Sequence, residues 1–351
     1  MIKNNKKIFI FAIIFLIIVV FIFKLIHTNK NLKESNIITE DENSLFGELN
    51  SLSSWVTYWD LDVDDEIMEL ENKLDSLSYF AAYFNNNNEI VLPEKLLTYY
   101  NNTNLYKFKK YISIVNDIVY DDGTSSVKNK EVLSKVLSDD TARRNHIKEI
   151  IDLAKKYDFD GVEIDYEQIK EDISLWKDFL LFIKDLYSEA TFNNLELRVL
   201  LEPNAPIDKL EFVEGPTYVM MCYNLHGAFS GPGEKANEKF IKDLMEKMKK
   251  INSNKAFAIP TGGFQWSEDG KTKAVSELEV NKIKKQYNVE LKRDDKSKYL
   301  YFNYTDENKV KHEVWYADNV TLKDLYIPIN QWGYEVNLWR LGGNLFENTN
   351  R

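Results

Sequence analysis

Hydrophobic and polar positions follow two alternating rhythms along most of this chain. Short apolar runs typical of buried strands are followed by stretches with apolar residues at helical spacing, and from Ser51 onward this pair repeats about eight times. Such alternation implies parallel strands joined by crossover helices, and the number of repeats favours an α/β fold with a closed (β/α)8 barrel, the TIM barrel. The expected strands are 55–59, 79–84, 111–115, 159–167, 195–201, 218–223, 255–260 and 336–339. The expected helices are 64–77, 130–137, 140–156, 173–190 and 237–250.

Polar residues occur at or just past the ends of these strands. In a (β/α)8 barrel, side chains at the C-terminal ends of the strands line the active site. We therefore expect one face of the barrel to collect Asp60, Asn85, Asn116, Glu167, Glu202, Asn224 and Thr261.

One region, 266–323, is longer than a single crossover helix requires. It contains a helix-like piece at 275–287 and two alternating strand-like runs at 300–304 and 311–316. The residues between the two runs have the composition of a turn. The pattern predicts a small α+β insertion before the last strand of the barrel.

The N-terminal segment 8–26 is apolar apart from Lys24. Its length of about 19 residues is close to what a helix needs to cross the hydrocarbon core of a membrane. No small-x-small cleavage site follows it, so we favour an uncleaved signal anchor over a cleaved signal peptide. We expect a cytoplasmic N-terminus at 1–7, a single transmembrane anchor at 8–26, a polar linker at 27–50 and an extracytoplasmic catalytic domain at 51–351.

Composition narrows the classes of partner. The 351 residues carry a formal net charge of −11, which argues against a nucleic-acid partner because phosphate backbones require a basic surface. The single cysteine, Cys222, excludes an intrachain disulfide. It lies in an apolar run, so we interpret it as a small core residue rather than a nucleophile. We expect no cofactor and a monomeric chain.

The stretch 159–167 concentrates acidic residues between apolar ones. In a strand, Glu163, Asp165 and Glu167 would share one face. Like charges at this spacing repel and raise the pKa of at least one carboxyl group, which an acid catalyst at neutral pH requires. Two other interpretations remain open at this point: a Mg²⁺ or Ca²⁺ site, or a solvated edge strand.

Four motifs, taken together, resemble family 18 of the glycoside hydrolases, the chitinase-like enzymes. Residues 160–167, Asp-Gly-Val-Glu-Ile-Asp-Tyr-Glu, resemble the family signature Asp-Gly-x-Asp-x-Asp-x-Glu, and 221–224, Met-Cys-Tyr-Asn, resemble the motif Met-x-Tyr-Asp. The segment 258–263 is similar to the seventh strand, and Trp339 to the tryptophan that ends the eighth. The insertion, with 312–316, looks most like the spore-germination and cortex-lytic N-acetylglucosaminidase branch. Because these motifs accompany the acidic strand, we expect no metal site there.

The resemblance implies a role for each matching residue. Glu167 would be the general acid, Asp165 would orient the 2-acetamido group of the substrate, Tyr223 would donate a hydrogen bond to it, and Trp339 would form the floor under the sugar. The attacking group in this family is the acetamide oxygen of the substrate, so no enzymic nucleophile is used and configuration is retained. The implied partner is an aminoglycan: peptidoglycan, cortex glycan or a chitin oligomer.

Two positions depart from the family pattern, because Glu163 and Asn224 replace aspartates. Glu163 retains the charge and could still share a proton with Asp165, whereas Asn224 retains only hydrogen bonding. We place Glu163, Asn224, Glu202 and Met221 with Trp339 among the expected substrate-binding residues. The leading hypothesis is a membrane-tethered hydrolase of peptidoglycan or spore cortex. The alternative is a catalytically impaired barrel that binds glycan, and a chitinase is a weaker third possibility.

Tryptophan side chains are a further source of sugar contacts, because sugars stack on aromatic rings. Trp55, Trp59, Trp266 and Trp332 are candidates for such platforms, although ordinary packing accounts for more residues of this kind. His226 follows the 221–224 motif and is expected to have a structural or sugar-contact role.

Overall fold

The structure, a computed structural model, describes residues 45–103, 105–169 and 172–346. Contacts divide the chain into two compact units, Met1–Glu48 and Leu49–Arg351. The predicted N-terminus 1–7, the anchor 8–26 and most of the linker 27–50 lie outside the described residues. Within those ranges, the helices are all too short or too polar to cross a membrane. Phe46, inside the predicted polar linker, is buried.

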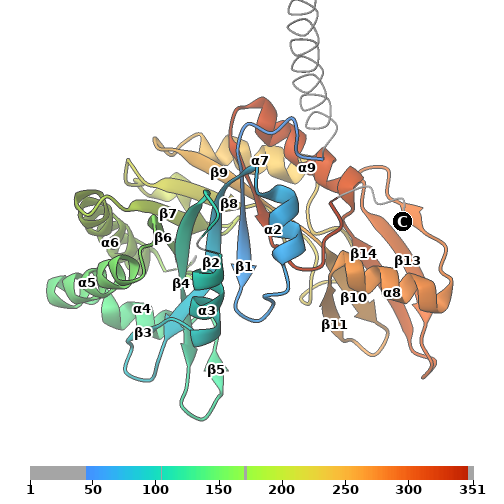
Figure 1. The fold of residues 1–351 in the computed structure, drawn as a ribbon, viewed down its shortest axis with the longest axis horizontal. Coiled ribbons are helices and arrows are strands. Elements are labelled where there is room, and N and C mark those ends of the chain that lie inside the picture. Colours follow the sequence, from blue (N-terminus) through green and yellow to red (C-terminus); the bar gives the residue numbers. More distant parts are fainter. Residues whose placement is uncertain (1–44, 104, 170–171, 347–351) are drawn as a thin grey trace, which may run out of the picture. The chain divides into compact units, whose positions relative to one another are not determined.

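Eight parallel strands close into a barrel in the second unit (Figure 1). The ring closes because β1 pairs with β15 on one side and with β2 on the other, which confirms the predicted barrel. In ring order the strands are β1 (Leu52–Thr57), β2 (Leu74–Phe84), β4 (Lys109–Val119), β6 (Gly161–Asp165), β7 (Glu196–Leu201), β8 (Thr217–Met221), β9 (Lys255–Pro260) and β15 (Glu335–Trp339). Two short strands, β3 (Ile90–Val91) and β5 (Ser125–Ser126), pair antiparallel to β2 and β4.

Several helices between the strands begin at residues whose side chains cap the helix. The side chain of Asp139 accepts hydrogen bonds from the N–H groups of Thr141 and Ala142, and Asn237 caps its helix through Phe240 N–H. The helices are α2 (Asp64–Leu70), α3 (Glu94–Asn102), α4 (Lys130–Val136), α5 (Asp140–Lys156), α6 (Ile173–Phe192), the 3-10 turn η1 (Ile207–Lys209), α7 (Glu238–Met248) and α9 (Asn319–Gln331).

The predicted helix 64–77 is wrong in its second half. Helix α2 ends at Leu70, and Leu74 begins β2, where it pairs with Leu52 of β1. Leu70, Leu74 and Leu77 have a spacing that fits a helix, but Leu74 and Leu77 are equally suited to a buried strand. Pairing of β2 with both β1 and β4 satisfies its backbone groups and decides in favour of the strand.

The insertion is a five-stranded antiparallel sheet with one helix packed on it. Its apolar core consists of Val275, Val280, Phe302, Val314 and Tyr316. It starts earlier than expected, at β10, and the predicted end at 319–323 belongs instead to α9. The elements are β10 (Gly263–Ser267), β11 (Thr272–Val275), α8 (Glu277–Tyr287), β12 (Lys292–Arg293), β13 (Leu300–Thr305) and β14 (Lys311–Tyr316), and they lie together at one side of Figure 1.

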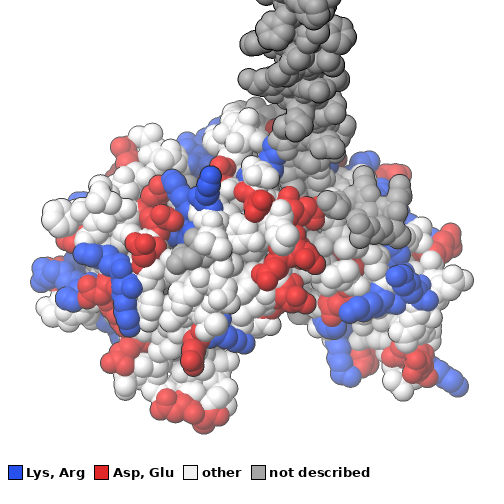
Figure 2. Space-filling model, viewed as in Figure 1, with Lys and Arg blue, Asp and Glu red and all other residues white. Residues whose placement is uncertain are grey.

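Charged side chains are mixed on the face shown in Figure 2, where basic groups lie in small clusters among acidic ones. Over the described residues as a whole, exposed ion pairs are common, for example Lys148 with Asp152 and Lys239 with Asp243. Pairs of this kind contribute little stability. Because acidic and basic groups are mixed on the face in view, this face differs from the continuous basic surface of a nucleic-acid-binding protein.

Candidate active site

The acidic motif spans the end of strand β6 and the start of the following loop. Glu163 and Asp165 are two residues apart in β6 and are both buried, whereas Glu167 lies beyond the strand. The expectation that all three share one strand face therefore holds only for the first two. Tyr166, between them and the loop, is buried, and its hydroxyl lies 2.6 Å from His146 Nε2. This contact holds Tyr166 in the interior, directly after the end of the strand.

The backbone of Glu167 is held by the side chain of Asn116, which is buried in β4. Asn116 Oδ1 accepts a hydrogen bond from Glu167 N–H at 3.0 Å, and its Nδ2 donates to Glu167 C=O at 3.1 Å. Both bonds involve main-chain atoms of Glu167, so they fix the position of the residue and leave its carboxylate available. The sequence pattern predicts only that Asn116 lies at a strand end on the face of the active site; it does not predict these contacts with Glu167.

The Glu167 carboxylate lies at the mouth of the barrel and forms an ion pair with Lys128. Burial raises the pKa of Glu167, the charge of Lys128 and its hydrogen bond lower it, and Glu202 and Asp117 raise it; the pKa lies above the ordinary value. Repulsion within the acidic motif, which the sequence predicts as the cause of such a rise, contributes less here. The structure shows that loss of solvent is the larger cause.

Tyr223 lines the cleft, and the buried Asp165 lies close enough to Tyr223 for its charge to act on the phenol. Burial, followed by the charge of Glu167, holds the pKa of Asp165 well above its usual range. Among the described residues, no hydrogen-bond donor reaches the buried Oδ1 of Asp165. Burial and the charge of Asp165 also raise the pKa of Tyr223, so its phenol remains a hydrogen-bond donor at neutral pH. The pair thus offers one acceptor and one donor to a bound group.

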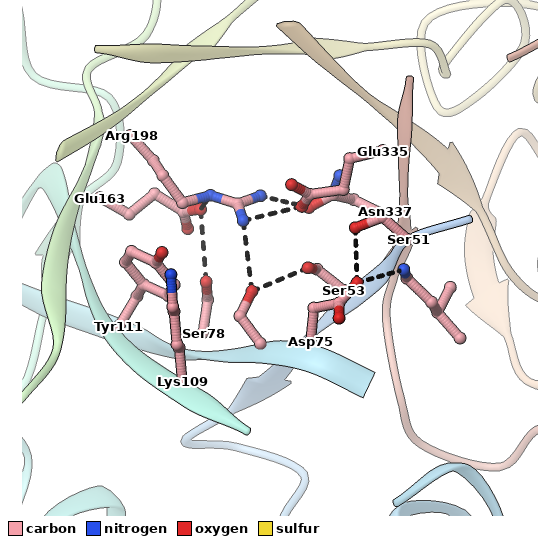
Figure 3. Close-up of polar contacts among 12 residues, drawn as sticks. Ser51, Ser53, Asp75, Ser78, Lys109, Tyr111, Glu163, Arg198, Glu335 and Asn337 are labelled. Carbon is pink, nitrogen blue, oxygen red and sulfur yellow. Dashed lines mark hydrogen bonds and ion pairs between the residues drawn. The ribbon is translucent and has the colours of Figure 1, made fainter. Parts of the chain in front are cut away.

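Glu163 belongs to a network inside the barrel rather than to the cleft (Figure 3). Its Oε1 accepts hydrogen bonds from Trp55 Nε1 at 2.5 Å and Ser113 Oγ at 2.6 Å, and its Oε2 from Ser78 Oγ at 3.3 Å. Arg198 Nε lies 3.1 Å from Oε2, as an ion pair that is not aligned as a hydrogen bond. All these partners are donors to the Glu163 carboxylate. In this structure its oxygens contact these donors, and a proton shared with Asp165 is not needed to satisfy them.

The side chain of Glu163 has no exposed surface, so contact with a substrate would require it to move. Its substrate-binding role stays a prediction, and the contacts in this structure give it a structural role. The guanidinium of Arg198, from β7, joins it to the opposite side of the barrel by pairing with Glu335 at 2.9 Å and donating to Asn337. The ring of Tyr111 lies 5.2 Å from the guanidinium carbon. Through the hydrogen bond from Trp55, Glu163 connects this network to the residues that pack against Trp339.

Trp339 ends strand β15 and provides an apolar surface beside Tyr223. Their ring centroids are 6.3 Å apart and the planes are inclined by 14°. The edges of Trp55 and Phe80 pack against Trp339 at 5.5 and 4.9 Å between centroids, which fixes its orientation. The half-buried indole has the position and the flatness that a sugar ring requires for stacking.

The cleft above the acidic motif has a volume of about 810 Å³. Its lining includes four expected site residues, Glu167, Glu202, Met221 and Tyr223, together with Lys128. Asn224 also borders it and, like Trp339, lines a neighbouring hollow. Asn224 has φ of 67°, a backbone conformation in which Asn is enriched. Among the residues that the structure describes, no group of three or more His, Cys, Asp or Glu side chains is arranged to hold a metal.

The other candidates separate according to exposure. Trp55 is fully buried, and Trp266 is buried with its indole N–H donating to Gly227 C=O, so both pack in the interior. Trp59 is half-exposed and lines the hollow next to Trp339, whereas Trp332 lies under the ammonium of Lys249. His226 Nδ1 lies 3.0 Å from the carbonyl oxygen of Gly231. The Cys222 thiol is buried, and burial raises its pKa.

Comparisons with known proteins agree with this geometry. Residues 54–325 match the profile described as Glycosyl hydrolases family 18. The uncharacterized glycosylase YvbX of Bacillus subtilis (strain 168) is 29% identical over 256 residues, covering 68% of this chain and 72% of that protein. A cortical fragment-lytic enzyme of the same organism is 24% identical over 231 residues, which cover 59% of this chain and about half (52%) of that enzyme.

Solved structures show the same fold. The spore cortex-lytic enzyme SleL of Bacillus cereus superposes with a TM-score of 0.71 at 19% identity, covering 85% of this chain and 72% of that one. These findings confirm the resemblance that the sequence motifs indicated.

Proposed function

Because this chain belongs to family 18 of the glycosyl hydrolases, we propose that it cleaves β-1,4 bonds after N-acetylglucosamine in peptidoglycan or spore cortex. The observation that carries the proposal is the pair formed by the acceptor Asp165 Oδ1 and the phenol donor Tyr223, next to the acidic Glu167. An acetamido group has one N–H donor and one carbonyl acceptor, which matches this pair. The cortex-lytic names of two relatives support the choice of polymer.

In the proposed mechanism, Glu167 protonates the glycosidic oxygen while the acetamide oxygen of the same sugar attacks the anomeric carbon. The bond to the leaving sugar breaks, and an oxazolinium ion forms. Asp165 accepts the acetamide N–H and stabilises the developing positive charge, and Tyr223 donates to the acetamide oxygen. Water then attacks the anomeric carbon, and Glu167, now a carboxylate, removes its proton. Two inversions give net retention of configuration.

We further propose that 8–26 anchors the protein in the cell membrane, with the catalytic domain outside the cytoplasm. The apolar sequence of this segment, interrupted only by Lys24, supports the proposal, and so does the location of a cell-wall substrate. Alkaline phosphatase folds only outside the cytoplasm, so fusing it to the C-terminus tests the topology. An inactive fusion would reject it.

Digestion of purified glycan tests the function. The full chain, purified in detergent, should release new reducing ends from peptidoglycan or spore cortex. The main alternative is a barrel that binds glycan with impaired catalysis, which the ion pair of Glu167 and the presence of Asn224 favour. Binding of these glycans without turnover at any pH from about 4 to 8 would support that alternative, whereas turnover excludes it.

Removing the phenol hydroxyl in Tyr223→Phe should reduce kcat by ~10²- to 10³-fold, as expected for loss of one preorganised donor to a developing charge. KM should change less, because the ring and its packing on Trp339 remain. Steady-state kinetics on a soluble glycan oligomer measure both constants. A variant with unchanged kcat would show that Tyr223 does not contact the reacting acetamide.

A further inference from the structure

Lys128 is held directly against the proposed acid by its own loop. The loop runs from β5 to α4, and Lys128 N–H donates to Asp117 Oδ1 at 2.7 Å. The next residue, Asn129, donates its N–H to the carbonyl of Asn116, the residue that also fixes Glu167. The ammonium and the Glu167 carboxylate are therefore positioned by connected backbone contacts. The Lys128 side chain is 37% exposed, so a ligand in the cleft can reach it.

This ion pair opposes the proposed chemistry. A general acid must carry a proton, and the positive charge of Lys128 lowers the pKa of Glu167, against the effects of burial and of Glu202 and Asp117. Conversely, Glu167 and the more distant Asp165 and Glu202 hold the ammonium of Lys128 in its charged form, although burial lowers its pKa. The acid would therefore form more readily if a bound substrate drew the ammonium away.

We propose that Lys128 binds the free lactyl carboxylate of a muramic acid that carries no stem peptide, in the sugar that follows the cleaved bond. The inference rests on the proposed function. In a GlcNAc-β-1,4-MurNAc unit the scissile oxygen is O4 of muramic acid, and the lactyl ether is attached to the adjacent O3. Glu167 must contact O4 to protonate it. Lys128, paired with Glu167, therefore lies next to the position of the lactyl group.

Such binding would make the acid dependent on the substrate. When the ammonium moves to the lactyl carboxylate, Glu167 loses its ion pair and gains a neighbouring negative charge, and both changes favour uptake of a proton from solvent. Chitin has no carboxylate, so it leaves the ammonium on Glu167. Lys128 would thus be a specificity-determining residue that favours glycans containing muramic acid without a stem peptide over uncharged ones.

The test compares three tetrasaccharides on the full chain in detergent: alternating GlcNAc and MurNAc with free lactyl carboxylates, the same oligomer with methyl-esterified lactyl groups, and chitotetraose. Wild type should show a kcat/KM roughly 10- to 100-fold higher for the free acid than for the ester, as expected for a charge-assisted hydrogen bond. Lys128→Met should remove this preference, and Lys128→Arg should retain most of it. The acid-to-ester comparison on wild type needs no variant, so the test does not depend on whether a variant folds.

The pH profile on chitotetraose provides a second readout. Removing the charge of Lys128 raises the pKa of Glu167, so its protonated form persists to higher pH. The alkaline limb of kcat/KM should therefore move upward in Lys128→Met, which a purely structural role would not cause. Burial, Asp117, Glu202 and Asp165 act on Glu167 in both proteins and leave the sign unchanged.

Lys130 provides a matched control, because it lines the same cleft and no ion pair with Glu167 is observed for it among the described residues. Lys130→Met should keep both the acid preference and the pH profile of wild type. Equal rates of wild type on the acid and the ester would overturn the role of Lys128 and leave the proposed function intact. Failure of wild type to cleave any of the three oligomers would instead reject the proposed function, and the inference with it.

Discussion

Glu167→Gln should lower kcat/KM on peptidoglycan or cortex glycan by ~10²- to 10⁴-fold, the typical contribution of a positioned general acid. Glutamine has the same shape but cannot donate the proton that the leaving oxygen needs. The contacts that position residue 167 involve its main chain and Asn116, so the fold around it should persist. Release of reducing ends from purified glycan, with the circular dichroism spectrum as a check on folding, measures the effect.

Glu196 supplies a matched control at the other end of the barrel. It also forms an ion pair with a lysine, Lys109, but lies at the start of β7, away from the cleft. Glu196→Gln should leave kcat/KM within a few-fold of wild type. Wild-type turnover by Glu167→Gln would show that another group is the acid, and an equal loss in both variants would indicate a general effect on the fold.

Arg198→Met should destabilise the protein by about 3–5 kcal/mol, the range for breaking a buried ion pair by removing one partner. The change leaves the carboxylates of Glu163 and Glu335 and the amide of Asn337 without their shared cation (Figure 3). Glu163 has no exposed surface, so water cannot replace the guanidinium there without rearrangement. Urea unfolding followed by circular dichroism measures the loss.

Two further variants separate charge from packing. Arg198→Met combined with Glu163→Gln should recover part of the stability, because the buried negative charge is removed along with its partner. Arg144→Met removes an exposed arginine that pairs with Asp140 at 3.2 Å, and should change the free energy of unfolding by less than about 1 kcal/mol. Equal stabilities of Arg198→Met and wild type would contradict a stabilising role for the network.

The sequence predicted the barrel and the principal residues of the cleft. Alternation of strands and helices suffices for the fold, because parallel strands require crossover connections. It also suffices to bring Glu167, Tyr223 and Trp339 together, since the C-terminal ends of barrel strands meet at one face. Both inferences use only local residue patterns and the geometry of a closed barrel. They therefore hold for residues that are far apart in the sequence.

The choice between helix and strand after Leu70 needed the tertiary structure. Leu74 and Leu77 fit both periodicities, and only the neighbouring strands β1 and β4 select one of them. Arg198 is a similar case. In the alternating run 195–201 a charged residue would ordinarily face solvent, yet the structure turns Arg198 into the barrel and leaves Leu197 and Val199 on the opposite side of the strand.

The residue pattern alone was enough to predict the fold, the order of its motifs and Glu167 as the candidate acid. The partners of each carboxylate, in contrast, depend on the tertiary structure. Arg198 pairs with Glu163 and Lys128 pairs with Glu167, whereas one oxygen of Asp165 has no hydrogen-bond donor among the described residues. The physical reason is that charge interactions depend on distance and burial. Both are set by which strands and loops become neighbours, and one residue pattern is compatible with many such arrangements.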